Sequence, residues 1–307
     1  MTFSRCALRA AALALVPLLA GCAPQRGAAR SGRRRIVATY PVLAAVVADL
    51  AGDAFEVRSA MPNGVDVHAW EPSARDIEAL TRADLVVANG AGLEGGLEKA
   101  LDQALRAGAG RFSAADHLQL RRVGVGEGVP SGDPDQAAGA QDPHFWTDPL
   151  AVKAMVDALA LDLRQRFGVD LGARRADLDA RLLALDVEIR AKVAALPPAR
   201  RKLVTGHESL GYFAQRYGFR LVGAVIPGLT SEAEGSAAGM EALKPLSRQN
   251  GVTVVFTELG TPPRTVEALA REAKVRAVPL ATHTLPADGS YFSFERELAD
   301  TIIRGLQ

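Results

Sequence analysis

A long apolar stripe in the second half of the sequence leaves few possible folds. Its members recur every three or four residues, as on one face of an α-helix, and they are Leu178, Leu182, Leu185, Ile189, Val193 and Leu196. Proline cannot continue a helix from its interior, so Pro197 and Pro198 mark the end. At 1.5 Å per residue, about 25 residues extend about 37 Å, the span of a small domain. We therefore expect one long rigid helix over 169–197 that links two parts of the protein.

Strand-like and helix-like segments alternate on both sides of this helix. The segments RIVATY at 35–40 and KLVTG at 202–206 are apolar and rich in β-branched residues, and each is followed by a helical pattern. This alternation is typical of mostly parallel sheets covered by helices, in which ligands bind at the carboxyl ends of the strands. We predict two pseudo-symmetric α/β lobes, over 36–168 and 198–307.

The first residues predict the compartment in which the protein works. Two arginines, a short apolar run and small residues precede Cys22, which is typical of a secretory signal over 1–21 that is too short to span a membrane. The ending LAGC resembles the lipobox of bacterial lipoproteins, in which the cysteine carries the lipid. We expect 22–35 to be a lipidated, flexible tether on the outer face of the cell membrane. An ordinary thiol at Cys22 is the alternative.

Composition excludes some classes of partner and of fold. The 307-residue chain has a formal net charge of +1, so no basic field attracts nucleic acid. Only two cysteines are present, and Cys6 would leave with the signal, so we expect no internal disulfide. A chain that is 48% hydrophobic is long enough to stabilise two lobes by burial alone.

Three of the five histidines lie in turn-rich loops at the ends of predicted elements, and they are His68, His144 and His207. Neutral imidazole is the commonest metal ligand, and its second nitrogen usually needs an acceptor. Nearby acids could fill that role, and they are Asp66, Glu71, Asp142 and Glu208. No local spacing joins the three histidines, so the residues alone indicate a metal site without establishing it. We expect His117 and His283 to be surface or packing residues, with His283 the better candidate for an accessory role.

The loops of the three histidines belong to three longer segments, PNGVDVHAWEPSARDIEALTRADLVVANGAGLE, DPHFWTDP and TGHESLGYFAQRYG. In this order and spacing they resemble the zinc and manganese solute-binding lipoproteins of ABC importers, also called cluster A-I or metal-binding adhesin lipoproteins. The resemblance runs from about Arg35 to the C-terminus. It implies two α/β lobes, one connecting helix and a metal ion held in the cleft. It also implies a monomeric receptor, not an enzyme, that delivers the ion to a membrane permease.

Carried over by position, the resemblance implies that His68, His144 and His207 are the first three metal ligands. The third position is histidine in many zinc binders of the family and glutamate in typical manganese binders. Three imidazoles with one carboxylate suit a near-tetrahedral Zn²⁺ site, whereas Mn²⁺ prefers oxygen and binds more weakly. We therefore expect Zn²⁺, with a manganese or iron receptor of the same family as the alternative.

The fourth ligand is less clear from the sequence. Family members often place an aspartate two residues before a tyrosine near the C-terminus, where this chain has Gly289 before Tyr291. The nearest acid is Asp288, which we expect to bind after a small loop shift. Water, His283 or Glu258 are the alternatives. With such a site, metal binding should weaken as the pH falls through about 6.5, the pKa of an unperturbed imidazole.

Two other functions remain open at this stage. The segment HESLG begins like the metalloprotease pattern in which two histidines flank a glutamate base, but Gly211 stands where the second histidine would be. A tethered zinc hydrolase with Glu208 as base is therefore the rival from another class. A surface adhesin is the third possibility, although no segment marks a protein-binding face.

Overall fold

Short runs of buried aliphatic residues form a four-stranded parallel sheet in the amino-terminal half. This computed structural model describes residues 32–125, 127, 137–232 and 237–307. The strand order is β2-β1-β3-β4, with all neighbours parallel. All four residues of the segment LVVA are buried, as expected for a strand covered on both faces. The strands are β1 (Arg34–Ala38), β2 (Phe55–Ser59), β3 (Leu85–Ala88) and β4 (Gly110–Ser113).

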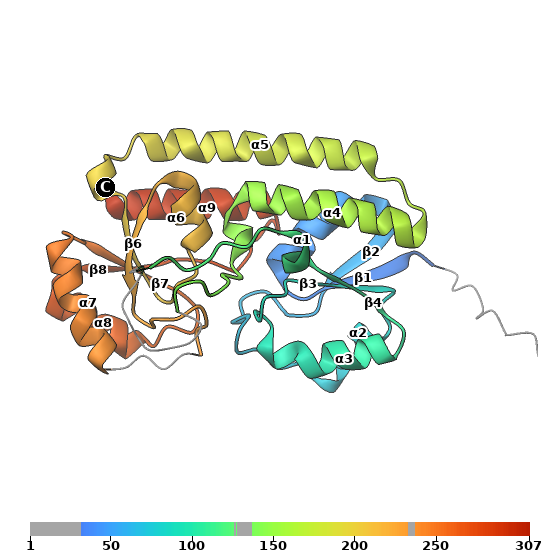
Figure 1. Ribbon diagram of the computed structural model, residues 1–307, viewed down its shortest axis with the longest axis horizontal. Coiled ribbons are helices and arrows are strands. Elements are labelled where there is room, and N and C mark those ends of the chain that lie inside the picture. The colour runs from blue at the N-terminus through green and yellow to red at the C-terminus, as the bar shows by residue number, and fades with distance from the viewer. Residues whose placement is uncertain (1–31, 126, 128–136, 233–236) are drawn as a thin grey trace, which may run out of the picture. The chain divides into compact units, whose positions relative to one another are not determined.

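Helices cover both sides of this sheet, with α1 and α4 on one side and α2 and α3 on the other (Figure 1). Local sequence explains their starts. Pro41 occupies the first turn of α1, and Ser73 with Asp76 forms a capping box at α2. The helices are α1 (Pro41–Ala51), α2 (Ala74–Thr81), α3 (Glu98–Arg106) and α4 (Pro149–Phe167). Short 3₁₀ turns are η1 (Gly52–Ala54), η2 (Gly95–Leu97), η3 (Ala114–His117) and η5 (Phe145–Thr147).

The carboxyl-terminal half repeats the alternation with two parallel strand pairs, β5 with β6 and β7 with β8. Strands β5 and β7 lie next to each other, so the two pairs continue one layer. The strands are β5 (Lys202–Thr205), β6 (Arg220–Ala224), β7 (Val254–Thr257) and β8 (Arg276–Pro279). The helices are α6 (Gly211–Tyr217), α7 (Ala237–Gln249), α8 (Pro263–Ala273) and α9 (Tyr291–Leu306), and a 3₁₀ turn, η6 (Pro198–Arg200), precedes β5.

The predicted long helix is α5 (Gly172–Ala194). It packs on α4 of the first half and on α9 of the second, along one side of both (Figure 1). All six residues of the apolar stripe are buried, and they belong to a core cluster that runs through both halves. The predicted fold class, two α/β lobes with parallel sheets joined by a long helix, is thereby confirmed.

Some expectations differ from the structure or fall outside its described part. Strand β4 was not predicted, because its segment GRFS has no β-branched residue and Phe112 is its only large apolar residue. Strand β1 begins at Arg34, inside the expected tether over 22–35. The expected signal over 1–21 and the anchor Cys22 lie outside the described residues. In the ranges that are described, no helix has the length and apolar character needed to cross a membrane.

The contribution of α5 to stability can be tested at Ile189, which is fully buried. We expect Ile189→Ala to lower the free energy of unfolding by about 2–5 kcal/mol, since it removes buried methyl groups and leaves a cavity. Urea unfolding of the metal-free protein would measure this. Val187→Ala, at a position of the same helix that is 65% exposed, should change the free energy by less than about 0.5 kcal/mol. Equal effects of the two substitutions would contradict the packing described for α5.

Candidate metal centre

Three buried histidines bring their Nε2 atoms together between the two halves. His144 Nε2 lies 3.3 Å from His68 Nε2 and 3.3 Å from His207 Nε2. Among the described residues, one donor atom from each of the three lies within 4.8 Å of the others. The first half supplies His68, after β2, and His144, before α4, while His207 follows β5 in the second half.

The spacing suits a small, borderline-soft cation. Zn²⁺ binds imidazole nitrogen at about 2.0–2.1 Å in a tetrahedron, and the edge of such a tetrahedron is about 3.3–3.4 Å long. Both Nε2 distances from His144 match this edge. The three side chains can therefore hold a zinc ion as three of four ligands with little movement.

His144 is oriented by Asp142 in the segment DPHFWTDP. Asp142 Oδ1 accepts a hydrogen bond from the backbone N–H of His144 at 3.0 Å and lies 2.9 Å from His144 Nδ1. The carboxylate therefore favours the tautomer with the proton on Nδ1, which leaves the Nε2 lone pair for a metal. Asp142 is fully buried and is paired with Arg121 Nη1 at 3.0 Å. This is the role that the sequence suggested for Asp142.

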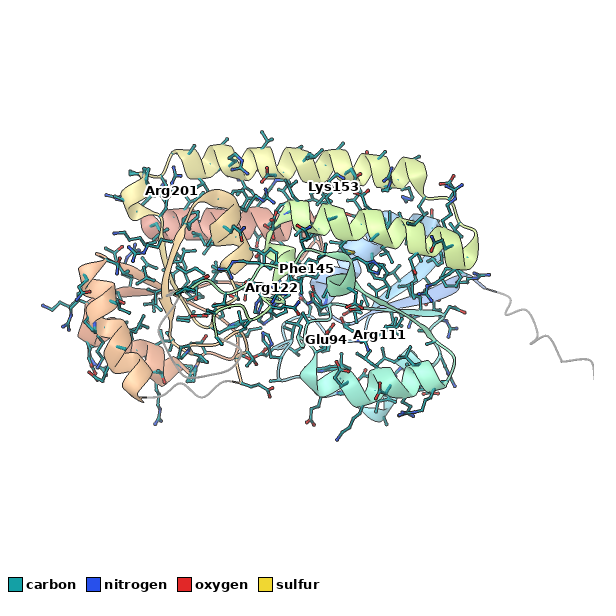
Figure 2. The ribbon with its side chains drawn as sticks, viewed as in Figure 1. Glu94, Arg111, Arg122, Phe145, Lys153 and Arg201 are labelled. Carbon is teal, nitrogen blue, oxygen red and sulfur yellow. The ribbon has the colours of Figure 1, made fainter. Side chains whose placement is uncertain are left out.

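Two further polar residues, not singled out in the sequence, hold the loops in place. Glu94 accepts hydrogen bonds from Thr39 Oγ1 at 2.7 Å, after β1, and from the backbone N–H of Asn89 at 2.6 Å, after β3. Asn89 Nδ2 in turn donates to the carbonyl of Pro143 at 3.0 Å, directly before His144. Burial raises the pKa of Glu94, which is labelled in Figure 2. The only sequence signal was an acid within a glycine-rich turn, which is common on protein surfaces.

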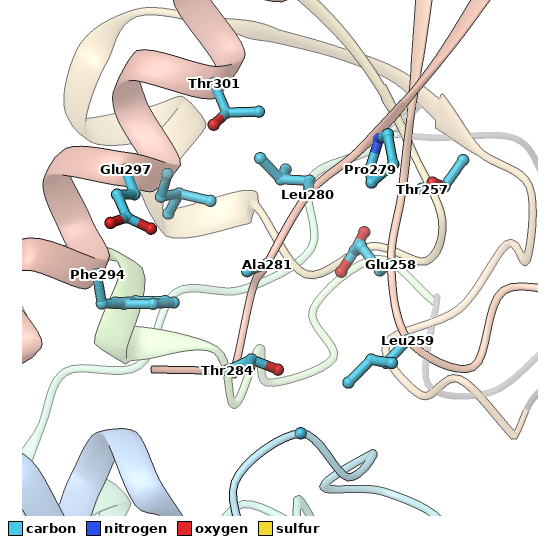
Figure 3. Close-up of a pocket in the computed structure, with 12 residues that line it drawn as sticks. Thr257, Glu258, Leu259, Pro279, Leu280, Ala281, Thr284, Phe294, Glu297 and Thr301 are labelled. Atoms are coloured by element: carbon cyan, nitrogen blue, oxygen red, sulfur yellow. The ribbon is translucent and has the colours of Figure 1, made fainter. Parts of the chain in front are cut away.

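The carboxylate beside the His207 ring is that of Glu258, which follows β7. Figure 3 labels Glu258 among the residues that line a neighbouring cavity. Glu258 Oε2 lies 3.3 Å from His207 Nδ1, although the ring N–H does not point along a good hydrogen bond. The same carboxylate accepts hydrogen bonds from Ser209 Oγ at 2.6 Å and Thr282 Oγ1 at 2.8 Å. Burial raises its pKa, and these two hydrogen bonds partly offset that effect. Glu208, the acid expected here, is buried, and its backbone N–H donates to the carbonyl of Gly228.

The loop of His68 is shaped by Asp66. Asp66 Oδ1 accepts a hydrogen bond from the backbone N–H of His68 at 3.0 Å, and Oδ2 accepts one from Ser231 Oγ of the other half at 2.5 Å. Asp66 therefore fixes the backbone of the ligand loop and ties it across the cleft. Glu71, the other expected acceptor, is exposed.

The structure does not bring Asp288 to the three histidines. Asp288 is exposed, and its carboxylate accepts hydrogen bonds from the backbone N–H of Ser290 at 3.0 Å and from Ser293 Oγ at 2.6 Å. These hydrogen bonds lower its pKa. The side chain therefore stabilises the first turn of α9. Among the other histidines, His117 is exposed and stacks on Phe112, whereas His283 is buried beside the cluster.

The buried rings favour the neutral, metal-binding form. Burial, reinforced by neighbouring imidazoles, holds the pKa values of His68 and His207 well below 6.5. Because the three rings are buried, their Nε2 lone pairs are shielded from water, and a bound cation would take the place of water there. Proton competition should therefore begin at a lower pH than the value of about 6.5 expected for free imidazole.

The position of Gly211 bears on the hydrolase alternative. A Cβ atom at residue 211 would collide with the carboxylate of Asp142 and the guanidinium of Arg121. A second histidine of the metalloprotease pattern therefore has no room there unless the acid that orients His144 moves. The glycine belongs to the packing around this cluster.

The orienting role of Asp142 can be tested by Asp142→Asn, which keeps the shape but removes the charge. We expect zinc affinity to fall about 10- to 100-fold, as is usual when a partner of a metal-bound histidine is lost. Competition with a fluorescent chelator would measure the change. Asp162→Asn is the matched control, because Asp162 pairs with Arg166 on the surface of α4. An unchanged affinity in Asp142→Asn would show that the hydrogen bond does not orient the ligand.

Comparisons with known proteins point to one family. A family model described as "ZnuA: Zinc-uptake complex component A periplasmic" matches residues 36–305. The zinc-binding protein TroA of Treponema pallidum (strain Nichols) is 30% identical over 276 residues, which cover 87% of this chain and 82% of that protein. The solved structure of the periplasmic zinc-binding protein TroA from Treponema pallidum aligns with a TM-score of 0.76 at 27% identity, covering 90% of this chain and 99% of that one.

Two further relatives extend the range of metals. The metal ABC transporter substrate-binding lipoprotein FimA of Streptococcus parasanguinis is 27% identical over 302 residues, with 96% of each chain covered. The manganese-binding lipoprotein MntA of Bacillus subtilis (strain 168) is 28% identical over 293 residues, covering 93% of this chain and 89% of that one. Zinc-binding and manganese-binding proteins are thus similar to this chain at nearly the same identity.

Proposed function

Since this chain belongs to the ZnuA family of zinc-uptake components, we propose that it is an extracytoplasmic receptor that binds Zn²⁺ and delivers it to the permease of an ABC importer. The observation that carries the proposal is the convergence of three buried Nε2 atoms, from His68, His144 and His207, at the spacing of a tetrahedral zinc site. These three side chains are the proposed ligands, and the ion is cargo.

The donor chemistry supports zinc over manganese. Three imidazole nitrogens suit Zn²⁺, whereas Mn²⁺ favours oxygen ligands and lies at the weak end of the divalent affinity series. A manganese or iron receptor of the same family is the alternative. Competition titration of metal-stripped protein tests the choice. We expect one tight equivalent of Zn²⁺ that excess Mn²⁺ does not displace, and displacement of Zn²⁺ by Mn²⁺ would favour the alternative.

Membrane attachment through Cys22 and the permease partner belong to the same proposal. Relatives described as lipoproteins support the lipid anchor, and the lipobox-like segment LAGC indicates Cys22 as its site.

The proposed receptor acts as a monomer and catalyses no reaction. The crowding of Gly211 against Asp142 counts against a zinc hydrolase. Zinc-dependent cleavage of an ester or peptide, lost in His207→Ala, would restore that alternative.

We expect release of the ion to use loop movements without wide hinge opening. Three contacts join the halves near the ligands: Asp148 with Arg216, Asp66 with Ser231, and Asn63 with the backbone of Leu285. The helix α5 and the shared core oppose separation of the lobes. Small-angle scattering should therefore detect no large change in the radius of gyration when zinc is added. A clear compaction would contradict a rigid link between the halves.

A further inference from the structure

His283 is a buried imidazole with an unused nitrogen beside the three clustered histidines. His283 is 2% exposed, and its Nε2 atom has no hydrogen-bond partner among the described residues. The other ring nitrogen, Nδ1, lies 3.2 Å from Thr282 Oγ1. Leaving a buried polar atom unpaired is costly, so such an atom needs an explanation such as an ion that binds there.

The segment that carries His283 is tied to the loops of all three clustered histidines. The carbonyl of Thr282 accepts a hydrogen bond at 2.7 Å from Trp146 Nε1, two residues after His144. Thr282 Oγ1 donates to Glu258, the acid beside His207. Leu285 exchanges two backbone hydrogen bonds of 2.8 Å with the side chain of Asn63, in the loop of His68. The residues on both sides of His283 are therefore held by contacts with the three ligand loops.

Electrostatic coupling places His283 near the same point. Burial lowers the pKa of His283 to about 4, although Asp66 opposes this shift. His283 in turn contributes to the lowered pKa values of both His68 and His207. The four buried imidazoles therefore lie close together and offer nitrogen lone pairs that a cation can use.

The other candidates for a fourth protein ligand are already engaged. Asp288 is exposed and holds the first turn of α9. Both oxygens of Glu258 accept hydrogen bonds, Oε1 from the backbone N–H of Gly206 at 3.1 Å and Oε2 from two hydroxyl groups. Of the donors considered for the fourth position, only the Nε2 of His283 is both buried and unpaired.

We infer that His283 Nε2 is the fourth ligand of the ion, in the place expected for Asp288; this inference rests on the proposed metal-binding function. In the structure His283 lies outside the group whose donors are all within 4.8 Å of one another, so its loop moves inward when the ion binds. A cavity of about 530 Å³, lined by Ala281 and Thr284 and by Gly64 of the His68 loop, lies beside this segment (Figure 3).

Four neutral imidazoles have a chemical consequence for selectivity. They supply nitrogen only, so the site offers no oxygen ligand of the kind that Mn²⁺ prefers. The bound ion also keeps its full double charge, because no ligand is anionic, and Asp142 and Glu258 compensate it from behind the rings. His283 would therefore act as a residue that favours zinc over manganese.

The test compares His283→Ala and the closer mimic His283→Asn with Asp288→Ala and His117→Ala in the purified protein. Zn²⁺ affinity is measured by chelator competition, and the coordination of bound Co²⁺ by its visible absorption. We expect both His283 variants to bind Zn²⁺ about 100-fold more weakly and to change the Co²⁺ spectrum, while the other two variants match the unmodified protein. Thermal unfolding of the metal-free variants checks that each one folds.

Three results would overturn the inference. The His283 variants could keep both affinity and spectrum, or lose affinity with an unchanged Co²⁺ spectrum, which would make His283 a positioning residue. Asp288→Ala could instead reproduce the loss. In all three cases the unmodified protein still binds zinc and the proposed function stands. Failure of the unmodified protein to bind Zn²⁺ would remove the proposed function itself, and the inference with it.

Discussion

His144→Ala is expected to weaken zinc binding about 10²- to 10³-fold. The Nε2 of His144 lies 3.3 Å from the Nε2 atoms of both His68 and His207, so its removal takes away the donor that joins the other two in the cluster. The free energy of zinc binding at a site with four protein ligands is about 10–16 kcal/mol, or about 2.5–4 kcal/mol for each ligand. Each 1.4 kcal/mol of binding free energy is a factor of ten in affinity. Competition with a chelator of known affinity would measure the loss.

His117→Ala is the matched control for this experiment. It removes an imidazole from the same half of the protein, but His117 is exposed and stacked on Phe112. Its zinc affinity should equal that of the unmodified protein. A loss of less than tenfold in His144→Ala, or an equal loss in His117→Ala, would mean that the three-histidine cluster is not the zinc site.

Zinc affinity is expected to stay nearly constant from pH 8 to about 6.5 and to fall steeply only in more acidic solution. Zinc binds neutral imidazole, so protons compete only below the pKa of each ring in the metal-free protein. Burial and neighbouring imidazoles lower the pKa values of His68 and His207. This lowering moves competition to a more acidic range. Below that range, two rings that must each lose a proton weaken binding up to about 100-fold per pH unit.

Calorimetry at pH 6.5 in buffers of different ionisation enthalpy counts the protons released when zinc binds. Unperturbed rings with a pKa of about 6.5 would each release about half a proton, whereas the lowered pKa values of His68 and His207 predict almost none from these two. Release of clearly more than one proton per zinc ion at this pH cannot come from His144 alone, and it would show that the rings of His68 and His207 are not shielded from water in the metal-free protein.

Most of the fold was predictable because periodicity along the chain reports burial directly. The apolar stripe of α5 and the prolines after it predicted both the helix and its end. The alternation of apolar strands with helical patterns predicted the parallel sheets. Strand β4 was the exception. Its segment GRFS forms a strand because it pairs with β3, whereas its own residues do not favour a strand.

The candidate site was predictable only in part. The loops of His68, His144 and His207 could be recognised from local patterns, and Asp142 could be matched to His144 because the two are only two positions apart in the chain. Glu258 lies 51 residues after His207, so no local pattern indicated that it faces that ring. Asp288 was predicted as a ligand from its place near Tyr291, whereas the structure uses its carboxylate to hold the first turn of α9.

The sequence by itself determined most of the secondary structure, the three histidine loops and the resemblance to metal receptors, because each depends on residues that are near one another in the chain. Only the tertiary structure decided which donors meet. The Nε2 atoms of His144 and His207 are separated by 63 residues of chain and by 3.3 Å in space, a proximity that the packing of the two halves around α5 imposes. The same packing buries His283 beside them and leaves Asp288 in solvent. Burial determines which donors stay neutral and available for an ion, and burial is a property of the folded chain.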